Sequence, residues 1–169
     1  SMATVDVLKN SNNLVAETVF KLAGGKHVNG TGSAISAIAM FNTYCSINKL
    51  DCTKIRLTDG SGVSKNNLVT ANFMTDYMVT TTKIFGLEKL ESMLTKPKEG
   101  TLANRFFNMQ GKLWVKTGTL ANISGITGIM TAKSGKNYAF SIYINDGKSS
   151  ESDKKMLEEF IIKTAYSKF

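Results

Sequence analysis

The sequence is poor in the residues that metal sites, disulfide scaffolds and disordered chains require. Among 169 residues there are two cysteines, one histidine and one proline. Neither Cys45 nor Cys52 belongs to a Cys-x-x-Cys pair or has a histidine neighbour, so no metal site is predicted. With one proline and 42% hydrophobic residues, the chain is expected to form a single folded domain rather than a disordered segment.

The same scarcity limits the catalytic possibilities. His27, the sole histidine, follows Gly24-Gly25 in what is expected to be an exposed loop, and no acidic partner lies nearby, so a Ser-His-Asp triad is not predicted. The two cysteines leave two alternatives open. They form a disulfide across a short loop if the protein is exported, or they remain separate small buried side chains.

Long apolar runs and clustered charge are also missing. No stretch is long enough to span a bilayer, and the N-terminus lacks the pattern of a signal peptide. Ser1-Met2 is interpreted as a tag remnant, so an export signal could lie upstream. The net charge of +8 comes from lysines scattered along the chain, without a basic run interleaved with aromatics. This pattern favours a solvated surface and not nucleic-acid binding.

Hydrophobic spacing predicts helices in the first part of the chain. A helix is expected over 12–23, with Ser11 at its N-cap and a stop at Gly24. Three more are expected: one from Thr31 or Ser33 to about Ile47, one beginning at Thr70, and a short one over 87–94. Their apolar stripes are interpreted as core.

From Gly111 onward the period changes to two. Three strands are predicted, joined as an antiparallel meander over 113–116, 125–131 and 137–144. A final helix begins near Ser150 or Ser152, and its inward face is expected to carry Met156, Phe160, Ile161 and Ala165. The predicted fold class is therefore α+β.

Two short motifs stand at element ends. Lys116-Thr117-Gly118-Thr119 closes the first predicted strand, where a lysine can hold charge at the mouth of a cleft and glycine lets a substrate lie against the backbone. Ser11-Asn12-Asn13 places a hydroxyl and amides at a helix entry, in an S-x-N pattern.

Together with 59–68 (Asp-Gly-Ser-Gly-Val-Ser-Lys-Asn-Asn-Leu), these motifs and their flanks, 8–17 and 116–120, resemble a known family. The chain is similar to the C-terminal part of the class C, PBP4-like penicillin-binding D-alanyl-D-alanine carboxypeptidases and endopeptidases, peptidase family S13. The resemblance implies the penicillin-recognising serine transpeptidase and beta-lactamase-like fold, an antiparallel sheet flanked by helices. It also implies a periplasmic or other extracytoplasmic location, peptidoglycan peptides ending in D-Ala-D-Ala as substrates, beta-lactams as ligands of the full enzyme, and no cofactor.

The resemblance also implies roles for single residues. Ser11 would relay a proton to the leaving nitrogen, Asn13 would bind a substrate carbonyl, and Lys116 would hold the Ser11 hydroxyl and attract the terminal carboxylate. Thr117 and Thr119 would offer hydroxyls to that carboxylate beside Gly118, and the Thr119 N–H would be one of two oxyanion donors.

Two positions depart from the usual pattern. Relatives often carry Asp where this chain has Asn12, and Arg where it has Lys65, so a substrate contact by Lys65 would lose the fork geometry of a guanidinium. Asp59 and Ser61 are expected to hold a loop beside the cleft.

The nucleophile motif of the family, S-x-x-K, should precede S-x-N, but only ten residues precede Ser11. The matches at 46–49 and 152–155 come after S-x-N, in the wrong order, and are interpreted as chance. Residues 1–169 are therefore expected to be the C-terminal portion of the domain, without the nucleophile helix and first strands, and inactive alone. The missing N-terminal portion would be a partner, and an unpaired strand at 137–144 would invite dimerisation.

The sequence leaves two other functions open. The chain could be a non-catalytic module that binds peptidoglycan or a partner. A serine beta-lactamase relative is disfavoured, because no Glu-x-x-Leu-Asn motif follows Ser11.

Overall fold

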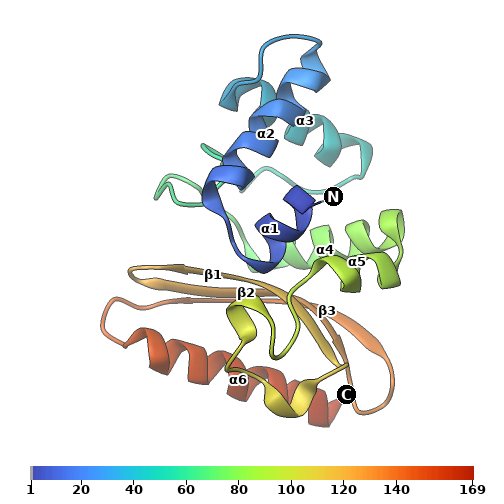
Figure 1. Cartoon of the computed structure of the whole chain (residues 1–169), viewed down its shortest axis with the longest axis vertical. Coiled ribbons are helices and arrows are strands. Elements are labelled where there is room, and N and C mark those ends of the chain that lie inside the picture. Colours follow the sequence, from blue (N-terminus) through green and yellow to red (C-terminus); the bar gives the residue numbers. More distant parts are fainter. Residues whose placement is uncertain (1) are drawn as a thin grey trace.

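A three-stranded sheet separates two groups of helices (Figure 1). The computed structural model describes residues 2–169, so the expected tag residue Ser1 lies outside the described part. The strands follow one another as the predicted antiparallel meander: β1 (Leu113–Leu120), β2 (Ile123–Thr131) and β3 (Asn137–Asn145). The predicted end of the first strand was wrong, because β1 continues through the Lys-Thr-Gly motif to Leu120 and pairs along its whole length with β2, which begins at Ile123. One side carries α1 (Met2–Lys9), α2 (Asn13–Val28), α3 (Ala34–Ile47), α4 (Ala71–Phe85) and α5 (Leu87–Met93). The other carries the short turns η1 (Gly100–Leu102) and η2 (Phe107–Met109) and the long helix α6 (Glu151–Lys168).

Each face of the sheet has its own hydrophobic cluster, because successive side chains of a strand point to opposite faces. Val115 and Ile126 belong to the cluster that also contains Ile162 of α6. Trp114 and Ile129 pack with Met78 of α4 on the other face. The α+β class is thus confirmed, with the sheet as the middle layer.

Side-chain caps begin the helices that the sequence predicted best. Ser33, Thr70 and Ser150 accept hydrogen bonds from the third backbone N–H of α3, α4 and α6, respectively. The first helix, α1, was not predicted. It has no buried residue and is only eight residues long, too short to establish a helical period in the sequence.

The prediction for α2 was wrong at both ends. Its N-cap is Asn12 rather than Ser11, and the helix continues through Gly24 to Val28, which places His27 in the last turn rather than in a loop. Gly24 lies within the helix, where the lack of a side chain lets α2 pack closely against α3. A Cβ built there would lie 2.3 Å from the backbone nitrogen of Ala37 in α3.

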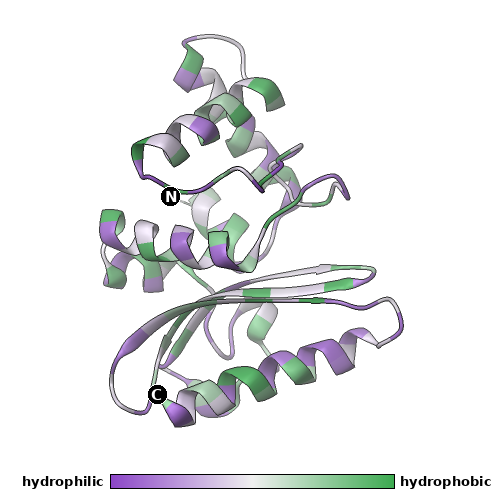
Figure 2. Cartoon of the chain, turned by 180° about the vertical axis from the view of Figure 1, so that it is seen from behind, coloured by the Kyte–Doolittle hydropathy of each residue, from purple (hydrophilic) through white to green (hydrophobic). Residues whose placement is uncertain are grey.

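The predicted inward face of α6 was also wrong. Met156, Phe160 and Ile161 are exposed, at 60%, 68% and 39%, and only Ala165 packs against the core. The side chains buried against the sheet are Lys154, Glu158 and Ile162, at spacings of four. Figure 2 shows the hydrophobic residues distributed along α6. The apolar stripe of α2 is exposed as well, at Leu14, Val19 and Leu22.

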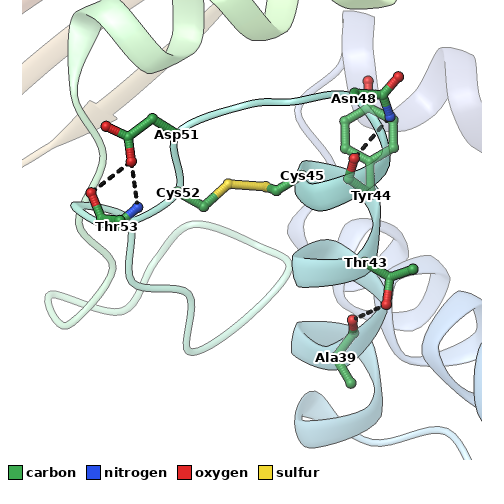
Figure 3. Close-up of a disulfide and its surroundings, with 8 residues drawn as sticks. All are labelled: Ala39, Thr43, Tyr44, Cys45, Asn48, Asp51, Cys52 and Thr53. Carbon is green, nitrogen blue, oxygen red and sulfur yellow. Dashed lines mark hydrogen bonds between the residues drawn. A yellow bond between two sulfur atoms is a disulfide. The ribbon is translucent and has the colours of Figure 1, made fainter.

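A disulfide joins Cys45, near the end of α3, to Cys52 in the segment that follows (Figure 3). Of the two alternatives left open by the sequence, the structure has the bonded one. Asp51 accepts hydrogen bonds from the backbone and hydroxyl of Thr53 just beyond the bridge. Among residues 2–169, no helix has the length and apolar character needed to cross a bilayer.

Candidate functional site

The S-x-N and Lys-Thr-Gly motifs meet in space. The Lys116 ammonium donates a hydrogen bond of 2.8 Å to the Ser11 hydroxyl, across a sequence separation of 105 residues. A second hydrogen bond, of 2.5 Å, goes to the carbonyl of Thr117. The predicted contact between Ser11 and Lys116 is therefore confirmed.

A buried threonine connects the strand that carries Lys116 to the helix that precedes Ser11. Thr95 pairs with Val115 of β1 through two backbone hydrogen bonds of 3.0 and 2.8 Å. Its hydroxyl donates to the carbonyl of Leu8 at 3.1 Å, and its side chain is fully buried. The Lys9–Glu99 ion pair, at 3.0 Å, joins the same two segments. The end of α1 is thereby tied to the edge of the sheet beside Lys116.

Ser11 itself has a left-handed backbone conformation, with φ of 57°. This conformation is unfavourable for a residue with a Cβ, and its neighbours maintain it. Asn12 accepts a hydrogen bond from the N–H of Val15 and donates one of 2.7 Å to Asp6. The chain therefore reverses between α1 and α2 at a fixed point, with the Ser11 hydroxyl beside β1.

The Lys116 ammonium is half-buried, and burial lowers its pKa below the ordinary value of a lysine. The ammonium has no carboxylate among its hydrogen-bond partners within residues 2–169, since both partners are neutral oxygens. A lysine of this kind loses its proton more readily than an exposed one. The pair can therefore exchange a proton along the contact from nitrogen to hydroxyl.

Thr117, Gly118 and Thr119 line a hollow of about 220 Å³ on the other side of the strand from Lys116. The Thr117 hydroxyl donates to the hydroxyl of Thr101 at 2.7 Å. Gly118 has open space where a Cβ would stand, so a ligand can approach the backbone there. The rest of the lining comes from Thr101, Arg105, Ser124, Gly125 and Lys155.

The remaining predicted site residues are exposed. Asn13 is the first residue of α2, and its side chain forms no hydrogen bond within the described chain. Lys65 is exposed in the loop after Asp59, and it forms no hydrogen bond with Ser11 or Lys116 among the described residues. The roles predicted for these two side chains stay predictions.

The Asp59 loop is held as the sequence predicted. Asp59 accepts hydrogen bonds from Ser61, Gly62, Ser64 and Asn67. Burial alone would raise its pKa, but these hydrogen bonds outweigh that effect and hold the pKa below the ordinary value. The carboxylate is thus the organising centre of the loop rather than a candidate acid.

The sequence analysis missed three residues around the site, namely Thr95, Thr101 and Arg105. All three lie in the irregular segment between α5 and β1, where neither helical nor alternating spacing marks a residue. The one signal in the sequence was the rarity of arginine, since the chain has only Arg56 and Arg105. The structure shows that Arg56 is exposed, so Arg105 is the arginine of interest.

Known proteins share both the sequence pattern and the fold. The profile of the D-Ala-D-Ala carboxypeptidase 3 (S13) family matches residues 2–165. A D-alanyl-D-alanine carboxypeptidase of Actinomadura sp. (strain R39) is 31% identical over 153 residues, which cover 86% of this chain and 28% of that protein. The chain therefore spans less than a third of the curated relative.

Solved structures show the same architecture at lower identity. Penicillin-binding protein 4 (dacB) of Haemophilus influenzae, complexed with a beta-lactam, superposes with a TM-score of 0.84 at 19% identity, over 98% of this chain and 41% of that one. The predatory endopeptidase Bd3459 of Bdellovibrio bacteriovorus, in complex with immunity protein Bd3460, gives 0.72 at 20%, over 96% and 41%. The TLA-1 beta-lactamase gives 0.69 at 16%, over 98% and 63%. These structures confirm the penicillin-binding protein and beta-lactamase-like fold.

Proposed function

The chain belongs to the D-Ala-D-Ala carboxypeptidase 3 (S13) family, and on that premise we propose that it forms the substrate-binding and proton-relay part of a serine-type D-Ala-D-Ala carboxypeptidase or endopeptidase. Its substrates would be peptidoglycan peptides, outside the cytoplasm. The observation that carries the proposal is the 2.8 Å contact between Lys116 and Ser11.

Each motif has a role in acyl transfer from such a peptide. The Ser11 hydroxyl, held by Lys116, passes a proton to the nitrogen that leaves. Asn13, exposed at the start of α2, binds the substrate backbone. The hydroxyls of Thr117 and Thr119 receive the terminal carboxylate, and the Thr119 N–H donates to the developing oxyanion.

The nucleophile and its base are proposed to lie in chain outside this sequence. The two S-x-x-K matches inside it do not fit the role. Ser46 is exposed on α3, beside the disulfide, and Ser152 is exposed on α6. Neither serine forms a hydrogen bond with its own lysine within residues 2–169. The chain on its own is therefore expected to be catalytically inert.

Labelling with a fluorescent penicillin tests the proposal. The longer protein expected to carry this chain should become covalently labelled and should release D-alanine from a D-Ala-D-Ala peptide, whereas residues 1–169 alone should remain unlabelled. Labelling of residues 1–169 alone would show that the nucleophile lies within them.

A longer protein that neither reacts with penicillin nor releases D-alanine would refute the enzyme and favour the non-catalytic module. Cosedimentation with purified peptidoglycan would then measure its binding.

A further inference from the structure

The two halves of the Lys-Thr-Gly motif face opposite sides of the sheet. Lys116 shares its face with Trp114, which packs in the cluster with Met78 of α4. Thr117 and Thr119 share the face of Val115, whose cluster includes Ile162 of α6. The Lys116 ammonium is engaged by Ser11 and does not line the hollow of Thr117 and Thr119. A carboxylate in that hollow would therefore need another cation.

Two cations line the hollow, Arg105 and Lys155. Lys155 is the more exposed of the two and is paired with Glu151, so Arg105 is the buried cation that the structure holds there. It lines the hollow together with Thr117 and Thr119, and its side chain is only 10% exposed. Its Nε donates to Glu159 at 3.2 Å, and its Nη2 donates to Glu158 at 2.8 Å and to the carbonyl of Lys155 at 3.0 Å. A guanidinium held by three hydrogen bonds has little freedom left to lose on binding.

The support continues beneath β2. Glu158 is fully buried, and its second oxygen accepts a hydrogen bond of 2.6 Å from Ser124. Ser124 pairs with Thr119 across the β1–β2 hairpin. The position of Arg105 is thus fixed relative to the very segment that carries Thr119.

One nitrogen of the guanidinium remains available. Nη1 makes no hydrogen bond to any of residues 2–169, although Nε and Nη2 of the same group are engaged. Its two N–H groups suit a carboxylate oxygen, and a hydrogen bond between two charged groups is about twice as strong as one between neutral groups. Because two carboxylates, Glu158 and Glu159, already face Arg105, its attraction for a ligand carboxylate is short-ranged and depends on the direction of the Nη1 donors.

We propose that Arg105 binds the terminal carboxylate of the substrate, together with the hydroxyls of Thr117 and Thr119, while Lys116 serves the proton relay on the other face. This inference rests on the proposed function and reassigns the carboxylate contact that the family resemblance implied for Lys116. It makes Arg105 a substrate-binding residue from outside the three sequence motifs.

The test compares two peptides in the longer protein that carries this chain, one ending in D-Ala-D-Ala and one ending in D-Ala-D-alaninamide. Arg105→Lys keeps the charge but loses the fork. The expected result is a fall of at least tenfold in the ratio of kcat/KM for the carboxylate peptide to that for the amide peptide. A purely structural role would lower both values equally and leave the ratio unchanged, which would overturn the inference.

Arg105→Met could leave Glu158 buried without its partner, so the second variant is the double substitution Arg105→Met with Glu158→Gln. It should show the same fall in the ratio. Lys168→Met is the matched control, because Lys168 is an exposed residue in the last turn of α6 and is paired with neither Arg105 nor the two glutamates that hold it. A wild-type protein that cleaves neither peptide would refute the proposed function itself, and this inference with it.

Discussion

Ser11 combines an unfavourable backbone conformation with the most important contact of the site. Its φ of 57° belongs to the region that glycine occupies freely, yet glycine has no hydroxyl to offer Lys116. The geometry of this residue therefore serves the position of its oxygen rather than the stability of the chain.

Two substitutions measure the free-energy cost of the left-handed conformation of Ser11. Ser11→Gly and Ser11→Ala both remove the hydroxyl, and only glycine relieves the left-handed conformation. We expect Ser11→Gly to be more stable than Ser11→Ala by about 1 kcal/mol in urea unfolding of residues 1–169. Equal stabilities would mean that Ser11 stores no strain.

The buried ammonium of Lys116 likewise lowers the stability of the fold while it supplies a group for the proposed proton relay. Burial lowers its pKa, so between its folded and unfolded pKa values the unfolded chain binds more protons and stability rises with pH. The cost of burying the ammonium is fully present below the folded pKa.

We therefore expect Lys116→Met to raise the Tm at pH 7 by about 2–4 °C, corresponding to about 1 kcal/mol. The difference from wild type should shrink as the pH rises through the lowered pKa. Thermal melts from pH 6 to 10 measure this effect. In the longer protein the same substitution should lower kcat/KM at least about 100-fold. A variant less stable than wild type at pH 7 would contradict the argument.

Elements with local signals were predicted well from the sequence. Ser33 and Thr70 cap α3 and α4 by hydrogen bonds within three residues, and alternation marks the strands, so no distant contact had to be known. The predictions failed where a partner elsewhere decides the outcome. Glu158 is buried in α6 because Arg105 and Ser124 satisfy its carboxylate. Spacing within one helix cannot reveal such a partner.

In the site, too, residues in sequence motifs were predicted, whereas residues that act through distant contacts were not. The family resemblance led to Ser11 and Lys116, whose contact the structure confirms. The links that bring them together begin at Thr95, a buried threonine in an irregular segment, and nothing in its local sequence distinguishes it from an exposed one.

Gly24 provides a test of how α2 and α3 pack. A Cβ at Gly24 would meet the backbone of Ser36 and Ala37, which cannot move aside as a flexible side chain can. We expect Gly24→Ala to destabilise residues 1–169 by about 2–3 kcal/mol in urea unfolding. Gly30→Ala is the control, because its nearest contact is 3.7 Å away and little change should follow. Equal stability of the two variants would show that the helices can separate at no cost.

At the scale of the whole molecule, two surfaces are incompletely covered. Within the described residues β3 pairs only with β2, which leaves one long edge without a strand partner. Exposed apolar side chains also follow α6, at Met156, Leu157 and Phe160. Both features suit a domain that is completed by further chain, as proposed above.

We expect residues 1–169 to dimerise through the β3 edge as the concentration rises, because unpaired strand edges readily add a strand. Size-exclusion chromatography with light scattering measures the association. Hydrogen exchange should then show increased protection of 137–145 in the concentrated sample. Phe160→Lys separates the two surfaces, since it changes α6 and should leave the dimer intact. A monomer at all concentrations would contradict the expectation.

Whether the Cys45–Cys52 bridge is present depends on the redox conditions under which the protein is made and stored. A bond that closes so short a loop contributes about 2–3 kcal/mol to the free energy of unfolding. It ties the start of the segment after α3 to α3 itself. That segment leads to the Asp59 loop, where the N–H of Gly60 donates a hydrogen bond to Glu17 of α2. Protein made in a reducing cytoplasm, or stored with a thiol reagent, would keep its sheet but lose the disulfide. The redox conditions of the expression host and of the buffer thus determine whether the segment after α3 is studied in its bridged or its reduced form.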